Sequence, residues 1–392
     1  MTLREEFDTE LPREGLSSMK WEYEKERTGF DDILSYGTAD MDFKSPEPVR
    51  KAICRVAEKG HLGYPYVPDS YYSAVENWLY RTTGWKIDGR QSISNHVGIY
   101  TSVWNVIQSM TREGDEIIIQ TPVHFCFGEM IRCNHRTVVE NPLKNVDGRY
   151  EIDFDQLESC FTRRTKLMWI CNPHNPVGRA WTKEELTEIG RLCLKHKVRI
   201  LSDDVYCGLL LPGNTYTPIA SLSKEISDIT ITCYSPSKTY NTTGIKFSYV
   251  VAENLDMMEL YDEALHQLDL NYGINLFGLA VTEAAYNECD GWVRELMEYI
   301  RENLEFLKVY LAENIPDITL VESEATYFAW LDCRSLGISS DALAEELEQE
   351  AHVILGSGEG LGTGGNGYLR MNLACPKKTL LRGLERIKTF FR

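Results

Sequence analysis

The chain is predicted to be an α/β protein, with a mainly parallel sheet covered by helices on both faces and a smaller α+β unit packed against it. Short apolar runs typical of buried strands alternate with helical patterns from about residue 99 to residue 250. Each of these runs ends in a polar loop. The alternation stops after about residue 285, and the length of 392 residues exceeds what one core usually organises.

Residues 1 to about 44 are predicted to form an arm with little periodic structure of its own. The arm ends in A-D-M-D-F (39–43) and the turn S-P-E-P, and helical patterns begin near Val49. A helix is then predicted to follow Gly98, just ahead of the strand E-I-I-I-Q. Its apolar face consists of Ile99, Val103, Val106, Ile107 and Met110. The start of this helix is a candidate phosphate site, because free backbone N–H groups and the helix dipole favour an anion there.

Regular alternation of strands and helices follows. The strand K-L-M-W-I-C leads to a loop and to a helix that begins with the capping box T-K-E-E, from Thr182 to Glu185. The residues expected to face inward from this helix are Leu186, Ile189 and Cys193. The strands V-R-I-L and I-T-I-T-C-Y come next. Because helices separate these strands, crossover connections and a mainly parallel sheet are expected.

The pattern after about residue 285 predicts a different unit. A long amphipathic helix, a strand pair near 318–332, another helix and a glycine-rich loop precede Y-L-R-M-N-L. The predicted division is an arm with part of the small domain at 1–44, a large domain at 45–285 and a small C-terminal domain at 286–392. No internal repeat or Gly/Ser linker separates these units, so tight packing is expected.

The bulk composition argues against several classes of partner and site. A formal net charge of −18 argues against nucleic acid or an anionic membrane surface, because both require clustered lysine and arginine. The N-terminus lacks the apolar core of a signal peptide and no segment runs 18 apolar residues, so a cytoplasmic protein is predicted. The 11 cysteines include no C-x-x-C pair, which favours reduced thiols over disulfides or a metal site.

Four polar loops carry the candidate chemistry: T-P-V-H (121–124), N-P-H-N-P-V-G-R (172–179), S-D-D-V-Y (202–206) and S-P-S-K (235–238). Ligands of open α/β sheets bind at the carboxyl ends of the strands, so these loops are expected to converge on one crevice. Together they supply the polar groups that hold pyridoxal phosphate. We expect Lys238 to carry this cofactor as a Schiff base, although a lone lysine in a serine-rich loop is usually a solvated side chain.

The other candidates each match one part of the cofactor or substrate. A buried carboxylate keeps the pyridine nitrogen protonated, and Asp203 suits this role, although Asp204 is a rival and an aspartate here can also cap a helix. The remaining candidates are Tyr206 and Asn175 for the phenolic oxygen, Ser235 with the backbone of Ile99 and Tyr100 for the phosphate, Lys246 for added positive charge, His124 for stacking on the ring, and Arg370 for a substrate carboxylate. Each of these residues could instead be structural.

Taken together, these segments resemble the fold-type I pyridoxal phosphate enzymes. The match runs from about residue 20 over nearly the whole chain in the expected order, and N-P-H-N-P-V-G-R is its most specific element. More narrowly, the chain resembles the MalY/PatB branch of cystathionine β-lyases, also called C-S lyases, within the class I and II aminotransferase superfamily. The resemblance implies a large domain with a mainly parallel seven-stranded sheet, pyridoxal 5'-phosphate as cofactor and a homodimer with shared active sites.

The resemblance also implies roles at matching positions. These are Lys238 as the catalytic Schiff-base lysine, Asp203 at the pyridine nitrogen, Asn175 and Tyr206 at the phenolic oxygen, Arg370 at the α-carboxylate, Ala39 beside the substrate, and Tyr64 reaching across the dimer interface to the neighbouring site. Several positions depart from the family pattern. The lyase branch commonly has a tryptophan where S-Y-G-T precedes A-D-M-D-F, and His124 and Lys246 replace a stacking aromatic and a phosphate-binding arginine. Tyr206 is more like the aminotransferases.

Three functions are compatible with these residues. The leading hypothesis is β-elimination from L-cystathionine or an S-substituted L-cysteine, which gives pyruvate, ammonia and a thiol. The second is transamination, which begins with the same proton abstraction by Lys238. The third is a regulatory protein that keeps the cofactor as a ligand and acts through protein contact, since we expect the short arm to leave no room for a DNA-binding domain.

Overall fold

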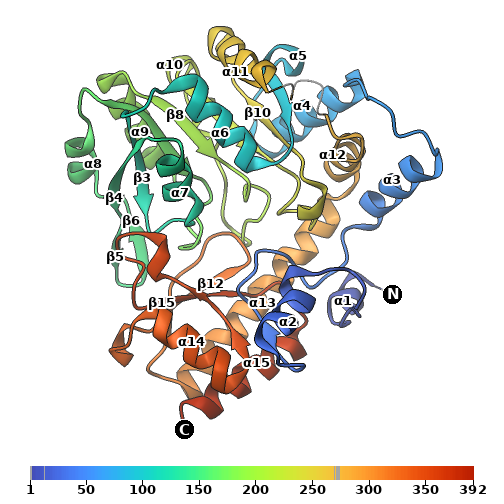
Figure 1. Ribbon diagram of the computed structural model, residues 1–392, viewed down its shortest axis with the longest axis vertical. Helices are drawn as coiled ribbons and strands as arrows, with labels where there is room; N and C mark the ends of the chain where they lie inside the picture. Colours follow the sequence, from blue (N-terminus) through green and yellow to red (C-terminus); the bar gives the residue numbers. More distant parts are fainter. Residues whose placement is uncertain (1, 13, 269, 271–273) are drawn as a thin grey trace.

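The computed structural model describes residues 2–12, 14–268, 270 and 274–392. Its upper part in Figure 1 contains a seven-stranded sheet of order β2-β10-β9-β8-β7-β3-β4. The strands are β2 (Ile93–His96), β10 (Ser248–Val251), β9 (Thr230–Tyr234), β8 (Arg199–Asp203), β7 (Thr165–Cys171), β3 (Glu116–Thr121) and β4 (Thr137–Pro142). Among these described strands, β10 alone runs opposite to the other six. The predicted mainly parallel seven-stranded sheet is confirmed.

Helices cover both faces of this sheet. On β3, Ile117 and Ile119 belong to one core, whereas Ile118 belongs to another. The helices that contribute to the first core are α6 (Ile99–Met110), α7 (Cys126–Cys133) and α11 (Leu255–Gln267), and those of the second are α8 (Phe154–Cys160), α9 (Lys183–His196) and α10 (Lys224–Ser227). Because successive side chains of a strand point to opposite faces, one continuous apolar run serves both cores.

Local signals in the sequence place two of these helices correctly. The predicted helix after Gly98 is α6, and its predicted apolar residues are buried apart from Ile99, which is half-buried. The capping box of α9 forms as predicted: Thr182 Oγ1 accepts from Glu185 N at 3.2 Å, and Glu185 Oε2 accepts from Thr182 N at 2.8 Å. The side chains predicted to face inward from α9 are all buried.

A further group of helices packs against the β2 edge of the sheet. It consists of α3 (Glu47–Glu58), α4 (Asp69–Thr83), α5 (Gly89–Ser92) and α12 (Leu276–Glu288). Helix α12 contacts both α3 and α4, and Tyr286 of α12 stacks on Trp78 of α4 with ring centroids 4.4 Å apart. Helices α3, α4 and α12 share a core with Tyr234 and Tyr249 of the sheet.

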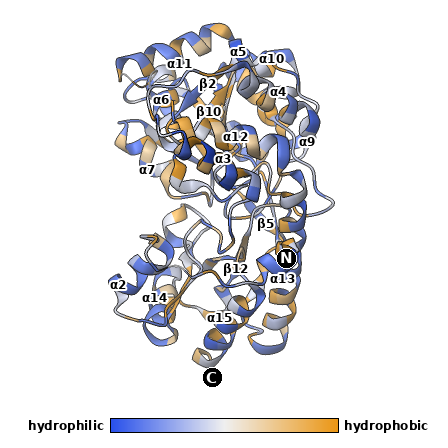
Figure 2. Ribbon diagram, turned by 90° about the vertical axis from the view of Figure 1, so that its right-hand side faces the viewer, coloured by the Kyte–Doolittle hydropathy of each residue, from blue (hydrophilic) through white to orange (hydrophobic). Residues whose placement is uncertain are grey.

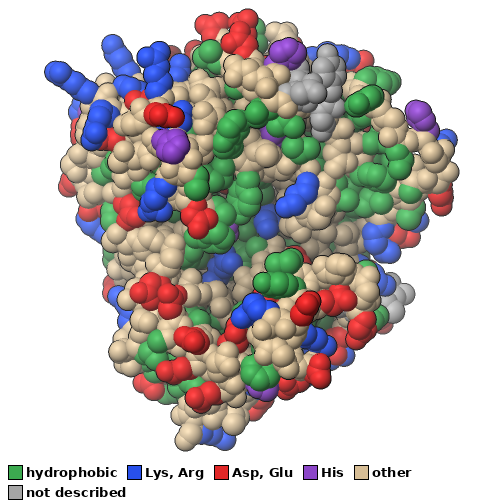
Figure 3. Space-filling view, viewed as in Figure 1, with side chains coloured by type: hydrophobic (Ala, Val, Ile, Leu, Met, Phe, Trp, Pro, Cys, Tyr) green, Lys and Arg blue, Asp and Glu red, His purple; other side chains and the backbone are tan. Residues whose placement is uncertain are grey.

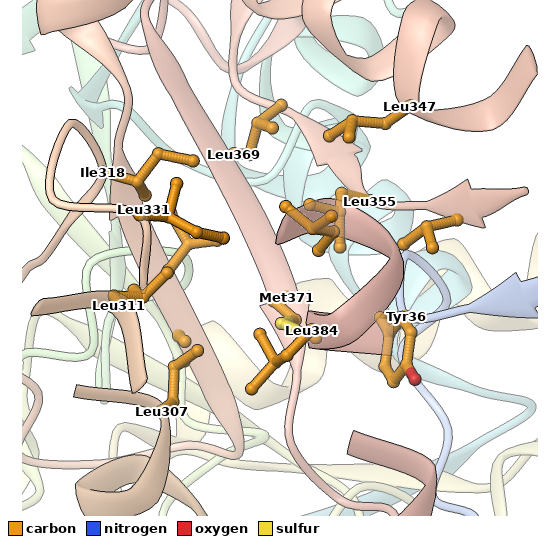
Figure 4. Close-up of a cluster of buried hydrophobic side chains, with 14 of the residues drawn as sticks. Tyr36, Leu307, Leu311, Ile318, Leu331, Leu347, Leu355, Leu369, Met371 and Leu384 are labelled. Atoms are coloured by element: carbon orange, nitrogen blue, oxygen red, sulfur yellow. The ribbon is translucent and has the colours of Figure 1, made fainter. Parts of the chain in front are cut away.

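The lower part in Figure 1 contains a four-stranded antiparallel sheet of order β11-β12-β15-β14. The elements are β11 (Thr319–Leu320), β12 (Phe328–Asp332), β14 (Gly356–Ser357) and β15 (Tyr368–Asn372), with α13 (Asp290–Asn314), α14 (Ser340–Ala351) and α15 (Lys377–Phe390). Figure 4 shows Leu331, Met371 and Leu384 from this part in one core with Tyr36 of the N-terminal arm. The predicted smaller α+β unit is therefore present, and the arm packs into it.

The arm contains more structure than its sequence pattern predicts. Its elements are α1 (Leu3–Phe7), a π-helical turn η1 (Met19–Tyr23), α2 (Glu24–Thr28) and β1 (Leu34–Ser35), which pairs in parallel with β13 (Val353–Ile354). These elements have two to five residues each, which is too short to give a periodic apolar pattern. The domain boundaries at 44 and 285 stay predictions; residue 285 lies within α12.

The remaining elements are short connections. They are β5 (Lys144–Val146), β6 (Arg149–Glu151), and the 3₁₀ turns η2 (Ile219–Ser221), η3 (Thr243–Ile245), η4 (Arg334–Leu336) and η5 (Glu359–Leu361). Figure 2 shows hydrophilic and hydrophobic stretches mixed along the surface helices. Within the described part of the chain, no helix combines the length and the apolar character needed to cross a membrane.

Candidate active site

A cavity of about 410 Å³ lies at the carboxyl ends of β7, β8 and β9, beside the start of α6. It is part of the hollow between the upper and lower parts of the molecule, where Figure 3 shows basic side chains on the wall. The predicted site residues that line it are Ala39, Ile99, Tyr100, His124, Asn175, Asp203, Tyr206, Ser235, Lys238 and Lys246. The structure therefore brings residues from 39 to 246 into one cavity.

Lys238 lies in the loop that follows β9. Its Nζ donates to the backbone oxygen of Ala39 at 2.8 Å. Burial lowers the pKa of Lys238 from its ordinary value to about 8, and the positive charge of Arg370 acts in the same direction. A pKa near 8 leaves roughly a tenth of this amine neutral at pH 7, far more than for an ordinary lysine, and a nucleophilic or basic lysine requires this neutral form.

Asp203 and Asp204 have different surroundings. Asp203, the last residue of β8, lines the cavity, and its Oδ1 accepts from Val205 N at 3.4 Å. Burial raises the pKa of Asp203 to about 7. Asp204 is buried outside the cavity lining and accepts hydrogen bonds from the hydroxyls of Ser202 and Tyr216. Its carboxylate is thus engaged in a structural network, whereas that of Asp203 faces the cavity.

Aromatic and amide groups occupy the wall near Lys238. Burial, followed by the charges of Arg370 and Lys238, lowers the pKa of His124 to about 3, so its imidazole is neutral and can stack on an aromatic ring. The Asn175 side chain lines the same cavity, and its Oδ1 accepts from Arg370 Nη1 at 3.1 Å. Tyr206 is buried, and burial raises its pKa, so its hydroxyl stays protonated and can donate.

The start of α6 lies at one end of the cavity. Gly98 has φ +94°, a conformation that favours glycine, and the next three residues begin the helix with N–H groups that have no partner within it. Lys246 also lines this end. The hydroxyl of Ser235 donates to Phe247 O at 2.6 Å, so in this structure Ser235 links its loop to the residue that precedes β10.

Arg370 lies in the middle of β15, next to the cavity wall. Its Nη1 contacts Asn175, and its Nη2 donates to Gly37 O at 2.9 Å. The guanidinium also lies 4.2 Å from the ring centroid of Phe328. These contacts orient a planar cation beside the cavity, where it can bind a carboxylate.

Of the predicted site residues, Arg370 lies beside the cavity without lining it, and Tyr64 lies away from it. The Tyr64 side chain is 95% exposed and lies near Leu62, Pro65 and Phe277. Conversely, the cavity includes residues that were not predicted from the sequence, among them Thr101, Phe127, Trp169, Ser237 and Thr243. Ser237 lies within S-P-S-K and could have been found there, whereas Trp169 is an apolar strand residue without any local signal of a site.

Comparison with known proteins agrees with this architecture. The model of the family "Aminotransferase class I and II" matches residues 33–387. The cystathionine beta-lyase PatB of Bacillus subtilis is 36% identical over 383 residues, covering 97% of this chain and 98% of that protein. The solved structure of cystalysin from Treponema denticola, which contains a pyridoxal 5'-phosphate cofactor, is 31% identical with a TM-score of 0.94 and covers 98% of both chains.

A PLP-bound C-S lyase from Staphylococcus hominis is 29% identical, with a TM-score of 0.89 and coverage of 98% of both chains. The family match extends over most of the chain, and the relatives align almost end to end. The resemblance inferred from the sequence is confirmed, and the chain belongs to the aminotransferase class I and II family.

Proposed function

We propose that the protein is a pyridoxal phosphate-dependent carbon-sulfur β-lyase that cleaves L-cystathionine or S-substituted L-cysteines. The observation that carries the proposal is the 36% identity to cystathionine beta-lyase PatB over 97% of this chain. The predicted cofactor agrees with the cofactor-containing structures of cystalysin and the S. hominis lyase. In the reaction, R-S-CH₂-CH(NH₃⁺)-COO⁻ and one water give R-SH, pyruvate and ammonium, so the Cβ–S bond breaks without any net oxidation.

The cavity fits pyridoxal phosphate in three respects. The buried carboxylate of Asp203 would be stabilised in its charged form by a protonated ring nitrogen. Lys238 offers a buried amine with a pKa of about 8 for covalent attachment. The start of α6 and Lys246 offer backbone donors and positive charge for a phosphate. When bound, the cofactor would act as an electron sink that acidifies the α-hydrogen of the amino acid.

The protein side chains would then orient the substrate and move its protons. Arg370 would bind the α-carboxylate with its planar guanidinium, assisted by Asn175. Lys238 Nζ, released from its covalent role, would remove the α-proton. Ala39, whose backbone oxygen already contacts Nζ at 2.8 Å, would limit the positions that the amine can adopt. Asn175 and Tyr206 would donate to the phenolic oxygen, and His124 would cover the ring face.

The lyase assay tests this function directly. The purified holoenzyme is mixed with L-cystathionine in the absence of a 2-oxo acid, and pyruvate and free thiol are measured over many turnovers. We expect equal, sustained release of both products. A single stoichiometric conversion of the bound cofactor, with no free thiol, would instead assign the chain to the aminotransferases of this family. Cofactor binding with neither result would leave a regulatory role.

We further propose a homodimer in which Tyr64 enters the active site of the second copy. The proposal is supported by the 95% exposure of Tyr64 and by the exposure of neighbouring Leu62 and Tyr66 at 62% and 79%. Co-expression of Lys238→Ala and Tyr64→Ala chains tests it. Although each variant alone should be nearly inactive, a random mixture should regain about a quarter of native activity, because half of the dimers would be hybrids with one intact site. Activity equal to the sum of the separate variants would contradict a shared site.

The domain division and the location of the protein also remain proposals. The units at 1–44, 45–285 and 286–392 are supported by the packing of Tyr36 into the C-terminal core and by the core on one face of the large sheet, which includes no described residue of the small sheet. Limited proteolysis should cut first near the exposed Lys44, since the boundary at 285 lies within helix α12, where Ala285 is buried. A cytoplasmic location is supported by the sequence features given above, and fractionation of cells that express the natural gene would test it.

A further inference from the structure

A second cavity, of about 290 Å³, is lined in part by Arg370 and adjoins the candidate active-site cavity described above, which we call the first cavity. The lining of the second cavity comes from α2 of the arm, the 37–38 loop, the start of α7, the β13–β14 region, η5 and β15. The lining residues are Glu24, Gly37, Thr38, Phe125, Ile354, Gly356, Ser357, Leu361 and Arg370. Phe125, Ile354 and Leu361 make part of its wall apolar. Of the described residues that line it, two are charged, Glu24 and Arg370.

The linings of the two cavities adjoin at three places. Asn175 lines the first cavity and contacts Arg370, which lines the second. Along the chain, Ala39 lines the first cavity and Thr38 the second, and the same is true of His124 and Phe125. A substrate whose carboxylate binds Arg370 therefore has the second cavity close to it.

The acidic residue that lines the second cavity is Glu24. Glu24 is largely buried, with 14% of its side chain exposed, and its Oε2 accepts from Arg27 Nε at 2.7 Å. The two terminal nitrogens of Arg27 contact Glu348 at 2.9 and 2.5 Å. Two carboxylates thus share one guanidinium, so this group as a whole is formally negative. A cation that enters the cavity would complete the pairing of Glu24.

We propose that this second cavity binds the part of the thioether beyond sulfur, and that Glu24 selects substrates with a distal ammonium group. The proposal rests on the proposed lyase function. L-Cystathionine carries such an ammonium in its leaving group, whereas simple S-alkyl cysteines do not. The apolar wall would contact the methylene groups and Glu24 would pair with the ammonium. Glu24 is therefore a specificity-determining residue and takes no part in breaking the bond.

A pair of nearly isosteric substrates tests the role of Glu24. S-(2-aminoethyl)-L-cysteine has an ammonium where S-propyl-L-cysteine has a methyl group, and both would release a thiol and pyruvate. Native enzyme should show a kcat/KM about tenfold higher for the aminoethyl compound, the usual size of a charge-assisted hydrogen bond. Glu24→Gln should lower kcat/KM for the aminoethyl compound about tenfold and change that for the propyl compound less than twofold.

Two control variants separate specificity from structure. Glu26→Gln removes the same charge from the same helix at an exposed residue outside the cavity lining, and should leave the preference unchanged. Arg27→Gln breaks the Glu24–Arg27 pair but keeps the Glu24 carboxylate, so the preference should persist or increase. An equal loss on both substrates in Glu24→Gln, or no loss on either, would overturn the proposal.

The same reagents distinguish failure of this inference from failure of the lyase function. If native enzyme cleaves neither thioether, the lyase function fails. Calorimetric Kd values of the two compounds for the holoenzyme then still report on Glu24. A native preference for the aminoethyl compound that Glu24→Gln abolishes would support the subsite, and equal Kd values in the native protein would refute it.

Discussion

Lys238→Ala should abolish turnover and remove the visible absorbance of the covalently held cofactor. The Nζ of Lys238 is a buried amine with a pKa of about 8, held 2.8 Å from Ala39 O in the cavity. We assign it both the attachment of the cofactor and the removal of the α-proton. A methyl group can perform neither task, so pyruvate release from L-cystathionine should fall by at least roughly 10⁴-fold. The fold should persist, since the substitution leaves the surrounding strands intact.

Two controls make this result specific. Lys183→Ala removes an exposed lysine from the start of α9 and should leave absorbance and rate unchanged. Addition of a small primary amine to Lys238→Ala should restore part of the turnover, because a free amine can replace the missing base. Appreciable turnover of Lys238→Ala without added amine would show that another residue removes the proton.

Asp203→Asn should lower kcat for thiol release by roughly 10² to 10³-fold while the cofactor remains attached. The substitution keeps the shape of the side chain and removes the charge that would hold a proton on the ring nitrogen. Asp203 is suited to this role because it is buried in the cavity wall, where burial raises its pKa to about 7 and makes a cationic partner favourable. The attachment chemistry at Lys238 does not depend on this charge, so the visible absorbance should survive.

The neighbouring carboxylate provides the matched control for Asp203. Asp204→Asn changes a buried carboxyl group that Tyr216 and Ser202 contact outside the cavity lining. This substitution should lower the stability of the protein, measured as a lower Tm, rather than lower kcat. If Asp204→Asn reduced kcat more than Asp203→Asn, the partner of the ring nitrogen would be Asp204 and the assignment would be wrong.

Much of the fold follows from local patterns in the sequence. Strand β3 reads as E-I-I-I-Q because both of its faces are covered, and the start of α9 is marked by the reciprocal bonds of Thr182 and Glu185. The candidate loops are recognisable because each follows an apolar strand. These signals are local, so a single sequence contains them. The elements of the arm are too short to leave such a signal, which is why α2 and its Glu24 were not expected near the site.

The sequence by itself determined the α/β class, the order of strands and helices, the family, and a set of candidate residues that includes Lys238 and both aspartates. The tertiary structure decided that Asp203 faces the cavity. Its neighbour Asp204 instead accepts a hydrogen bond from Tyr216 outside the cavity lining. The tertiary structure also brought Arg370 to Asn175, 195 positions away, and placed Glu24 and Arg370 in the lining of one cavity. The physical reason is that periodicity reports whether a residue is buried, whereas the group it meets depends on how distant elements pack.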